Sequence, residues 1–277
     1  MVNKYGVTSN FQDFTTYIPA SSFSSLSIAG AFTKGVMDKV VTITNVGELE
    51  NIFGIPNPAN RVSFFLAQQA LLVSNNLKVL RIPTSGSLNA TADGSGLLVK
   101  NRDHYDDNFS AGQGSVGSWC ARTAGVWGNA LRVSLCPADS TAYAAWAYKS
   151  SFPKVPSTSP YVSDRSGTLD EVHVAVIDVT GAISGTPDTI IERFEFLSLA
   201  SDALGLDGTT NYYKDVINNS SNYIYWLDHP TSLSNAGSTA SGTTFTVVTA
   251  PITNNLSGGV STSTVTLGEY QTAYTKL

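Results

Sequence analysis

Three histidines are the residues of this chain best suited to acid–base or metal chemistry. His104 lies in the acidic run Asp103–Asp107, whose carboxylates and imidazole could hold a cation. The run has no second cluster of ligands and lacks the spacing of a known metal loop. We therefore expect a solvated acidic turn here and no metal site.

The other two histidines also favour a structural role. His173 stands between Val172 and Val174 in a predicted strand, which indicates a hydrogen-bonded sheet histidine rather than a base, and His229 precedes Pro230 in a turn. The sequence contains no Gly-x-Ser-x-Gly elbow and no Walker-type phosphate loop. The residues predict no catalytic residue and no cofactor, and hence a protein that is not an enzyme.

The two cysteines, Cys120 and Cys136, fall on neighbouring predicted strands and could approach each other if those strands pair. Two cysteines do not make a disulfide framework. Residues 1–13 have no signal-peptide pattern, so we expect a reducing compartment and two buried thiols.

The amino-acid composition limits the kinds of molecule that this chain is expected to bind. Charged residues make up 13% of the chain, and small polar residues are abundant, which suits either a surface that meets other protein or an extracellular β-rich domain. A net charge of −5 with no basic run argues against nucleic-acid binding, and no apolar segment is long enough for membrane insertion. The four irregularly spaced tryptophans indicate core or interface anchors rather than a sugar-stacking platform.

The elements that must position these residues begin with a β-β-α-α-β block. Strands are expected at 27–35, 40–44 and 78–82, and helices after Asn45, an N-cap, and over 61–74. In the second helix the apolar spacing predicts a buried face made of Val62, Phe65, Leu66, Ala70 and Val73.

Beyond this block the pattern is richer in strands. We expect strands at 96–100 and 223–227, a hairpin of 171–179 with 190–199, and a short helix at 212–217; residues 150–166 look too polar for a core. A helix starts near Leu267, and its pattern is incomplete at Leu277. Residues 119–122 and 131–135 predict a strand pair joined by a turn. Gly125 and Gly128 in that turn should adopt backbone conformations that a β-carbon resists, with Trp127 packed beneath them.

The amino-acid sequence of this turn is more informative than its expected geometry. Ala124-Gly-Val-Trp-Gly-Asn-Ala-Leu-Arg-Val133, which includes Asn129, resembles a segment of contractile tail sheath proteins, the subunits of the outer tube of contractile phage tails and related injection machines. Further segments resemble that family in the same order: 29–35, 41–44, 49–54, 77–82, 195–198, 213–224 and 255–260.

The resemblance implies an α+β fold, in which a mixed sheet packs with helices, plus a β-rich inserted domain. The expected domains are an extended N-terminal arm (1–20), an α/β core segment (21–85), a β-rich domain with loop insertions (86–255) and the start of a C-terminal half (256–277). That half is missing here, so we expect a fragment, or otherwise a short member of the family.

The resemblance also implies the function of a structural subunit. Such subunits stack in rings, expected to be six-fold, around a tail tube protein, between baseplate and tail terminator proteins, and contract to drive the tube through the target envelope. They form part of the virion tail and are assembled in the host bacterial cytoplasm. The inter-subunit arm would use Val2, Lys4, Tyr5, Val7, Phe11 and Phe14. Phage tail and bacterial injection machine stay open, and the alternative function is a carbohydrate- or receptor-binding β-domain of a virion or secreted protein.

Overall fold

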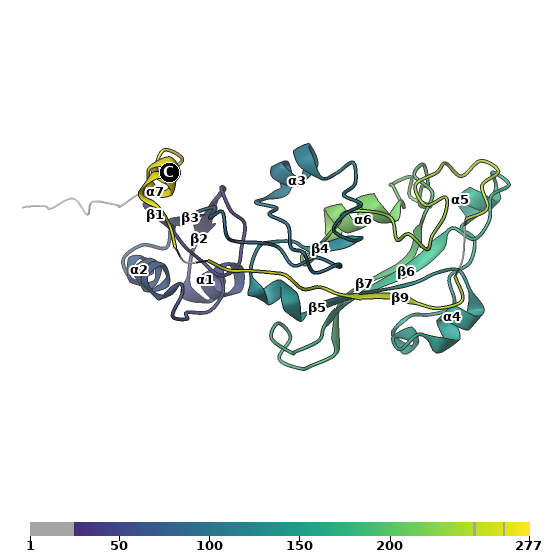
Figure 1. Cartoon of the computed structure of the whole chain (residues 1–277), viewed down its shortest axis with the longest axis horizontal. Coiled ribbons are helices and arrows are strands. Elements are labelled where there is room, and N and C mark those ends of the chain that lie inside the picture. Colours follow the sequence, from purple (N-terminus) through teal and green to yellow (C-terminus); the bar gives the residue numbers. More distant parts are fainter. Residues whose placement is uncertain (1–24, 246–247, 263) are drawn as a thin grey trace, which may run out of the picture.

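The first sheet lies at one end of an elongated molecule (Figure 1). The structure is a computed structural model that describes residues 25–245, 248–262 and 264–277. The strands β1 (Leu26–Gly30), β2 (Val40–Ile43) and β3 (Leu77–Arg81) are ordered β1-β3-β2, with β1 parallel and β2 antiparallel to β3. The expected β-β-α-α-β order is therefore confirmed.

Helices cover both faces of this sheet. α1 (Val46–Phe53) and α2 (Arg61–Leu71) pack on one face, and α7 (Leu267–Tyr274) packs on the other through Ala273. Asn45 caps α1 as predicted, because its side chain accepts a hydrogen bond from the Glu48 N–H at 2.9 Å. The final helix of the chain therefore completes a core that its first strands begin.

The predicted buried face of the second helix is wrong. α2 buries Ser63, Phe64 and Ala67 against the sheet, whereas the predicted set lies outward, apart from a partly buried Ala70. The helix carries apolar residues on more than one side, so periodicity could not decide which side meets the sheet. Phe64 settles it by packing with Phe32 and Phe53 in one cluster.

The second sheet has four antiparallel strands in the order β7-β6-β5-β9. Its strands are β5 (Leu131–Cys136), β6 (Glu171–Asp178), β7 (Thr189–Ser198) and β9 (Ile252–Asn255). The expected hairpin, β6 with β7, is confirmed. One face packs on α5 (Pro160–Ser163), α6 (Tyr213–Ser220) and a two-stranded sheet, and the other packs on α4 (Ser140–Ala145). The fold class is thus α+β, as the sequence predicted.

The strand pair predicted around the turn is wrong. β4 (Trp119–Ala121) pairs with β8 (Ile224–Trp226), while β5 pairs with β6 and β9, so the two strands belong to different sheets. The connection is a 3₁₀ helix, η1 (Val126–Ala130). Cys120 and Cys136 accordingly lie in separate clusters, both free and buried, as the prediction of two unbridged thiols required.

Three further local predictions need correction. The acidic run around His104 forms a helix, α3 (Arg102–Asn108), rather than a turn. Residues 96–100 form no strand, and Leu97 makes only an isolated bridge with Asn89. The segment 150–166, which begins within η2 (Lys149–Ser151), does enter a core, since Phe152 and Val162 are buried. Among the described residues, no helix is long and apolar enough to cross a membrane. The domain boundaries stay a prediction.

Candidate functional site

Gly125 begins the turn segment that the sequence singled out, and it adopts a conformation reserved for glycine. Its φ of 145° and ψ of 160° fall in a region that side chains resist, as predicted. A β-carbon built there would stand 2.2 Å from the carbonyl oxygen of Thr33, which precedes α1. The turn therefore touches the backbone of the N-terminal α/β block directly.

Gly128 is constrained for a different reason from the one predicted. Its φ is ordinary, but a β-carbon would stand 2.6 Å from the Ala121 β-carbon and 3.0 Å from that of Ala90. Next to it, the Asn129 amide donates to the Gly259 carbonyl at 3.0 Å and its oxygen accepts from the Gly259 N–H at 2.8 Å. η1 is thus packed on β4 and tied to the segment that precedes α7.

Trp127 is half-buried and joins the same two parts. Its indole N–H is 3.1 Å from both the carbonyl and the hydroxyl oxygen of Thr123, and that hydroxyl accepts from the Gly35 N–H at 3.3 Å. The Lys34 ammonium lies 5.2 Å from the ring centroid, a cation–π distance. Burial lowers the pKa of Lys34 from its usual value.

Arg81 at the end of β3 completes this junction. Its Nη1 donates to the Gly35 carbonyl at 2.7 Å and to the Ala124 carbonyl at 2.8 Å, so one guanidinium joins both parts of the chain. The side chain is 1% exposed, and burial lowers its pKa to about 9, which still leaves it protonated at neutral pH. Within the described part of the chain, Nη2 has no hydrogen-bond partner. Arg81 belongs to the segment 77–82 that resembles the sheath family, but its contacts with Gly35 and Ala124 were not predicted.

A groove of about 720 Å³ runs beside the junction, lined by residues of the α1 end, of η1 and of the loop around Ile183. Its lining mixes apolar residues with uncharged polar ones, and its charged residues are Lys34 and Glu50. The hydrogen bonds of this junction run between backbone groups and anchoring side chains. The junction therefore has the properties of a rigid structural joint between the two parts of the chain.

The similarity of this chain to known proteins bears on its family. No protein-family model matches the chain. A tail sheath protein of Salmonella phage ViI is 22% identical over 215 residues, which cover 70% of this chain and 33% of that protein. The chain is thus similar to a phage tail sheath protein. It spans about a third of that relative's length.

Two solved structures are also similar to this chain. The sheath tail protein from Listeria innocua superposes with a TM-score of 0.45 at 14% identity, over 91% of this chain and 37% of that one. The sheath tail protein from Desulfitobacterium hafniense gives 0.41 at 13% identity, over 96% and 41%.

Two of the three histidines of this chain, His173 and His229, are held by hydrogen bonds of their ring nitrogens. His173 Nδ1 accepts from the Phe196 N–H at 3.1 Å, and its Nε2–H donates to the Lys154 carbonyl at 2.8 Å. His229 Nδ1 and the Tyr213 hydroxyl share a hydrogen bond of 2.5 Å. Burial lowers the pKa of both imidazoles and raises that of Tyr213 well above its usual value.

His104 is engaged differently. Its Nδ1 is buried without a partner among the described residues, and burial and the Lys100 ammonium lower its pKa. Two of the nearby carboxylates have other partners, since Asp103 pairs with Lys39 and Asp106 with Arg102. In the part of the chain that the structure describes, no group of three metal-ligating side chains comes together.

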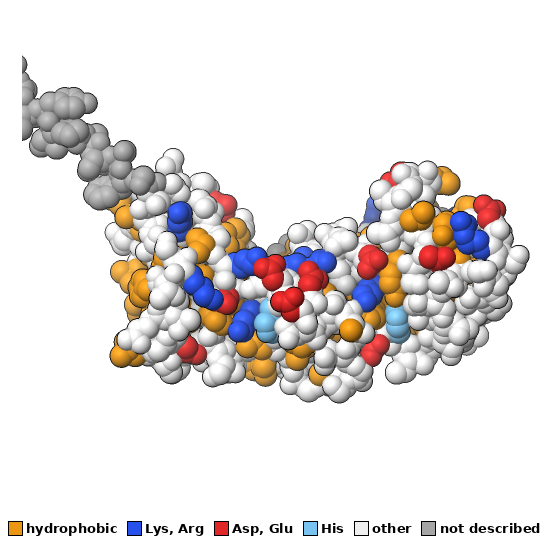
Figure 2. Space-filling model, turned by 90° about the horizontal axis from the view of Figure 1, so that it is seen from above, with side chains coloured by type: hydrophobic (Ala, Val, Ile, Leu, Met, Phe, Trp, Pro, Cys, Tyr) orange, Lys and Arg blue, Asp and Glu red, His pale blue; other side chains and the backbone are white. Residues whose placement is uncertain are grey.

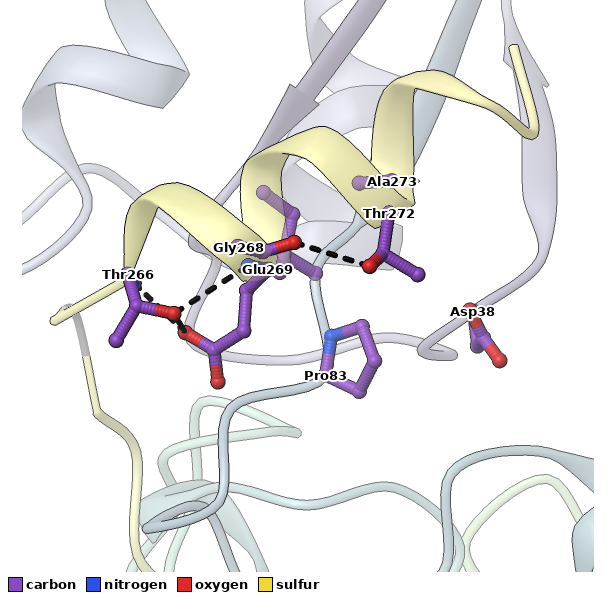
Figure 3. A pocket seen from close by; sticks show the side chains of 8 residues that line it. Asp38, Pro83, Thr266, Gly268, Glu269, Thr272 and Ala273 are labelled. Atoms are coloured by element: carbon purple, nitrogen blue, oxygen red, sulfur yellow. Dashed lines mark hydrogen bonds between the residues drawn. The ribbon is translucent and has the colours of Figure 1, made fainter.

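A second cavity, of about 350 Å³, lies beside α7 and contains two carboxylates (Figure 3). The Glu269 carboxylate caps its own helix by accepting from the Thr266 N–H at 2.7 Å, and Asp38 is paired with Lys276. Both carboxylates are therefore committed to holding α7 in place rather than to a ligand. The predicted arm residues (Val2, Lys4, Tyr5, Val7, Phe11 and Phe14) lie outside the described residues.

Proposed function

We propose that this chain is part of a structural subunit of a contractile tail sheath. The observation that carries the proposal is the match to the sheath protein of phage ViI, together with the turn segment, which the fold uses as a joint between its two parts. Subunits would stack in rings, taken as six-fold, around a tail tube protein. Baseplate and terminator proteins would bound the stack in the virion tail, after assembly in the host cytoplasm.

The mechanism requires parts that stay intact while subunits repack. A sheath that contracts must move its subunits as rigid bodies, and discrete packed interfaces transmit such motion better than soft ones. The joint at Arg81, Gly35 and Ala124 is buried and hydrogen-bonded, so it keeps the two sheets of one subunit in a fixed relation. The N-terminal arm would link neighbours by adding a strand to their sheets.

We propose no catalytic activity and no cofactor. His173 and His229 use ring nitrogens to hold backbone or tyrosine groups, as the distances above describe. The alternative, a carbohydrate- or receptor-binding β-domain, gains no support from the tryptophans. Trp119, Trp146 and Trp226 are buried within the fold, and Trp127 packs in the joint.

Electron microscopy of negatively stained protein tests the proposal. We expect the whole natural protein to polymerise into hollow tubes, and a variant lacking residues 1–16 to remain a folded monomer with unchanged circular dichroism. A deletion variant that still forms tubes of normal length would show that the arm does not link subunits. A whole protein that stays discrete while binding glycans would favour the alternative.

A further inference from the structure

β7 departs from regular strand geometry at a point where a side chain of β6 holds it. Two residues of β7, Glu195 and Phe196, lie opposite the single residue His173, which makes a β-bulge. Phe196 has a φ of 52°, in the left-handed region that residues with a β-carbon rarely adopt. Its N–H donates to His173 Nδ1 at 3.1 Å. The imidazole therefore holds the bulge in a conformation that the residues of the bulge do not favour by themselves.

Two contacts fix the tautomer of His173. Because Nδ1 accepts from the Phe196 N–H, the ring proton is on Nε2, which donates to the Lys154 carbonyl at 2.8 Å. A second proton on Nδ1 would turn the acceptor into a donor, and one N–H group would then face another. The contact with the bulge thus exists only while the imidazole is neutral.

His173 is shielded from water, and one of the groups that shield it lies near the surface. Figure 2 shows histidine side chains at the surface, in pale blue, close to charged ones, whereas His173 is 0% exposed. The ring centroids of Phe152 and Phe196 lie 4.7 and 4.6 Å from that of the imidazole. Phe152 is buried, but Phe196 is half-buried, in the last strand of the described sheet. Displacement of Phe196 would therefore admit water to the imidazole.

The surroundings of His173 disfavour a charged ring. Titratable and charged groups face it from each element packed against it: Cys136 of β5, Tyr143 of α4, Lys154 in the segment after η2, Arg193 and Glu195 of β7, and Glu171 of β6 itself. Glu195 attracts a proton to the ring, but its carboxylate also lies 3.3 Å from the Arg193 guanidinium. Burial lowers the pKa of His173, and the contact with Lys154 and the charge of Glu195 oppose this only in part. At neutral pH the ring is therefore neutral and holds the bulge.

We propose that His173 is a pH-operated latch of β7: the neutral ring holds Phe196 in the bulge, and protonation in acid releases Phe196 and opens the strand locally. The inference does not rest on the sheath function, since every contact lies within the described sheet and the segments that cover it. In the open form water reaches the imidazole, and its pKa returns toward the ordinary value of about 6.5. The open form then binds a proton that the closed form lacks, so its population rises about tenfold for each pH unit well below that value.

Amide hydrogen exchange at single residues of the full chain, measured by NMR, tests this. The ratio of the intrinsic rate to the observed rate at each pH gives a protection factor that is free of the pH dependence of the exchange chemistry. We expect the protection factor of the Phe196 amide to fall about tenfold between about pH 7.5 and pH 5.5. Local opening exposes little surface, so this protection should hardly change in low concentrations of urea.

The amide of Val133 is the reference, because this residue lies in β5, between β6 and β9, and exchanges through larger openings. Its protection factor should be higher than that of Phe196 and should fall steeply with urea. A Phe196 protection factor that is the same at both pH values overturns the proposal. A Phe196 protection factor with the urea dependence of Val133 also overturns it, since the amide then exchanges through global unfolding.

Two variants separate His173 from the other titrating groups. In His173→Gln the new side-chain amide can accept from Phe196 and donate to Lys154 without titrating, so the protection of Phe196 should not change with pH. His104→Gln, at the half-exposed histidine of α3, is the matched control and should keep the tenfold fall. An equal fall in His173→Gln would refute the latch. In the parent chain, the NMR shifts of the His173 ring nitrogens at neutral pH should show an unprotonated Nδ1, and a protonated Nδ1 would likewise refute it.

Discussion

Replacing Gly125 by Ala tests whether the turn segment is a rigid joint. The backbone region of Gly125 costs a residue with a β-carbon about 1–3 kcal/mol. The new methyl group would also meet the Thr33 carbonyl oxygen at 2.2 Å, and overpacking against backbone costs roughly 1–3 kcal/mol more. Reduced freedom of the unfolded chain returns about 0.4–1 kcal/mol. We expect a net loss of about 1–5.5 kcal/mol in the free energy of unfolding.

Two other glycines separate the two costs. Gly242 has a φ of 66° but open space around its β-carbon position, so Gly242→Ala should cost roughly 1 kcal/mol from backbone strain alone. Gly268 in α7 has neither a positive φ nor a close neighbour. Gly268→Ala should therefore stabilise the protein by about 0.4–1 kcal/mol.

Urea unfolding of the three variants, followed by circular dichroism, gives the comparison. The slope of the transition must stay constant for the free energies to be comparable. If Gly125→Ala loses no more stability than Gly242→Ala, the contact with Thr33 is not tight and the account of the joint is wrong.

Three further predictions concern the core. Phe64→Ala should lower the free energy of unfolding by about 3–5 kcal/mol in the same urea assay. The loss should be clearly larger than for Phe65→Ala, because Phe64 is 1% and Phe65 50% exposed. Equal losses would contradict the orientation of α2. Arg81→Met should cost roughly 1–3 kcal/mol by leaving the Gly35 and Ala124 carbonyls without donors, and Arg81→Lys should restore part of this; full stability of Arg81→Met would exclude a joint held by the guanidinium. His173 has a lowered pKa in the folded state, so the unfolded chain takes up its proton first on acidification. The stability that neutral His173 contributes is present above the unfolded pKa of about 6.5 and is lost as the pH falls from there toward the folded pKa. His173→Gln should therefore flatten the fall in unfolding free energy that is measured between neutral and mildly acidic pH. An unchanged slope would assign that fall to other groups.

Local signals in the sequence predicted local structure well. The Asn45 cap, the β6–β7 hairpin and the conformation of Gly125 depend on residues close to each other in the chain. The bulge in β7 did not follow from its own residues. Phe196 has a φ of 52°, and its N–H is held by His173 across the hairpin, a contact that only the register reveals.

Predictions that required a choice of partner failed more often. β4 and β5 are close in sequence, yet β4 pairs with β8 and β5 with β9, because each strand is completed by a segment from much later in the chain. α2 has apolar residues around most of its circumference, so the sheet contact had to be decided by tertiary packing. The role of Arg81 could not be predicted, because its partners, Gly35 and Ala124, approach it only in the folded state.

The pairing of β5 with β9 has a consequence for synthesis on the ribosome. β1, β2 and β3 come from residues 26–81, so the first sheet can form early during translation. The second sheet needs residues 252–255, and α7, which covers one face of the first sheet, follows at 267–274. Pairings between distant segments form slowly, and a nascent chain exposes apolar surface until they do. Ala29, Leu80 and Ile82 stay uncovered from the synthesis of β3 until α7 has been made, so the chain exposes this apolar surface to chaperones during that interval.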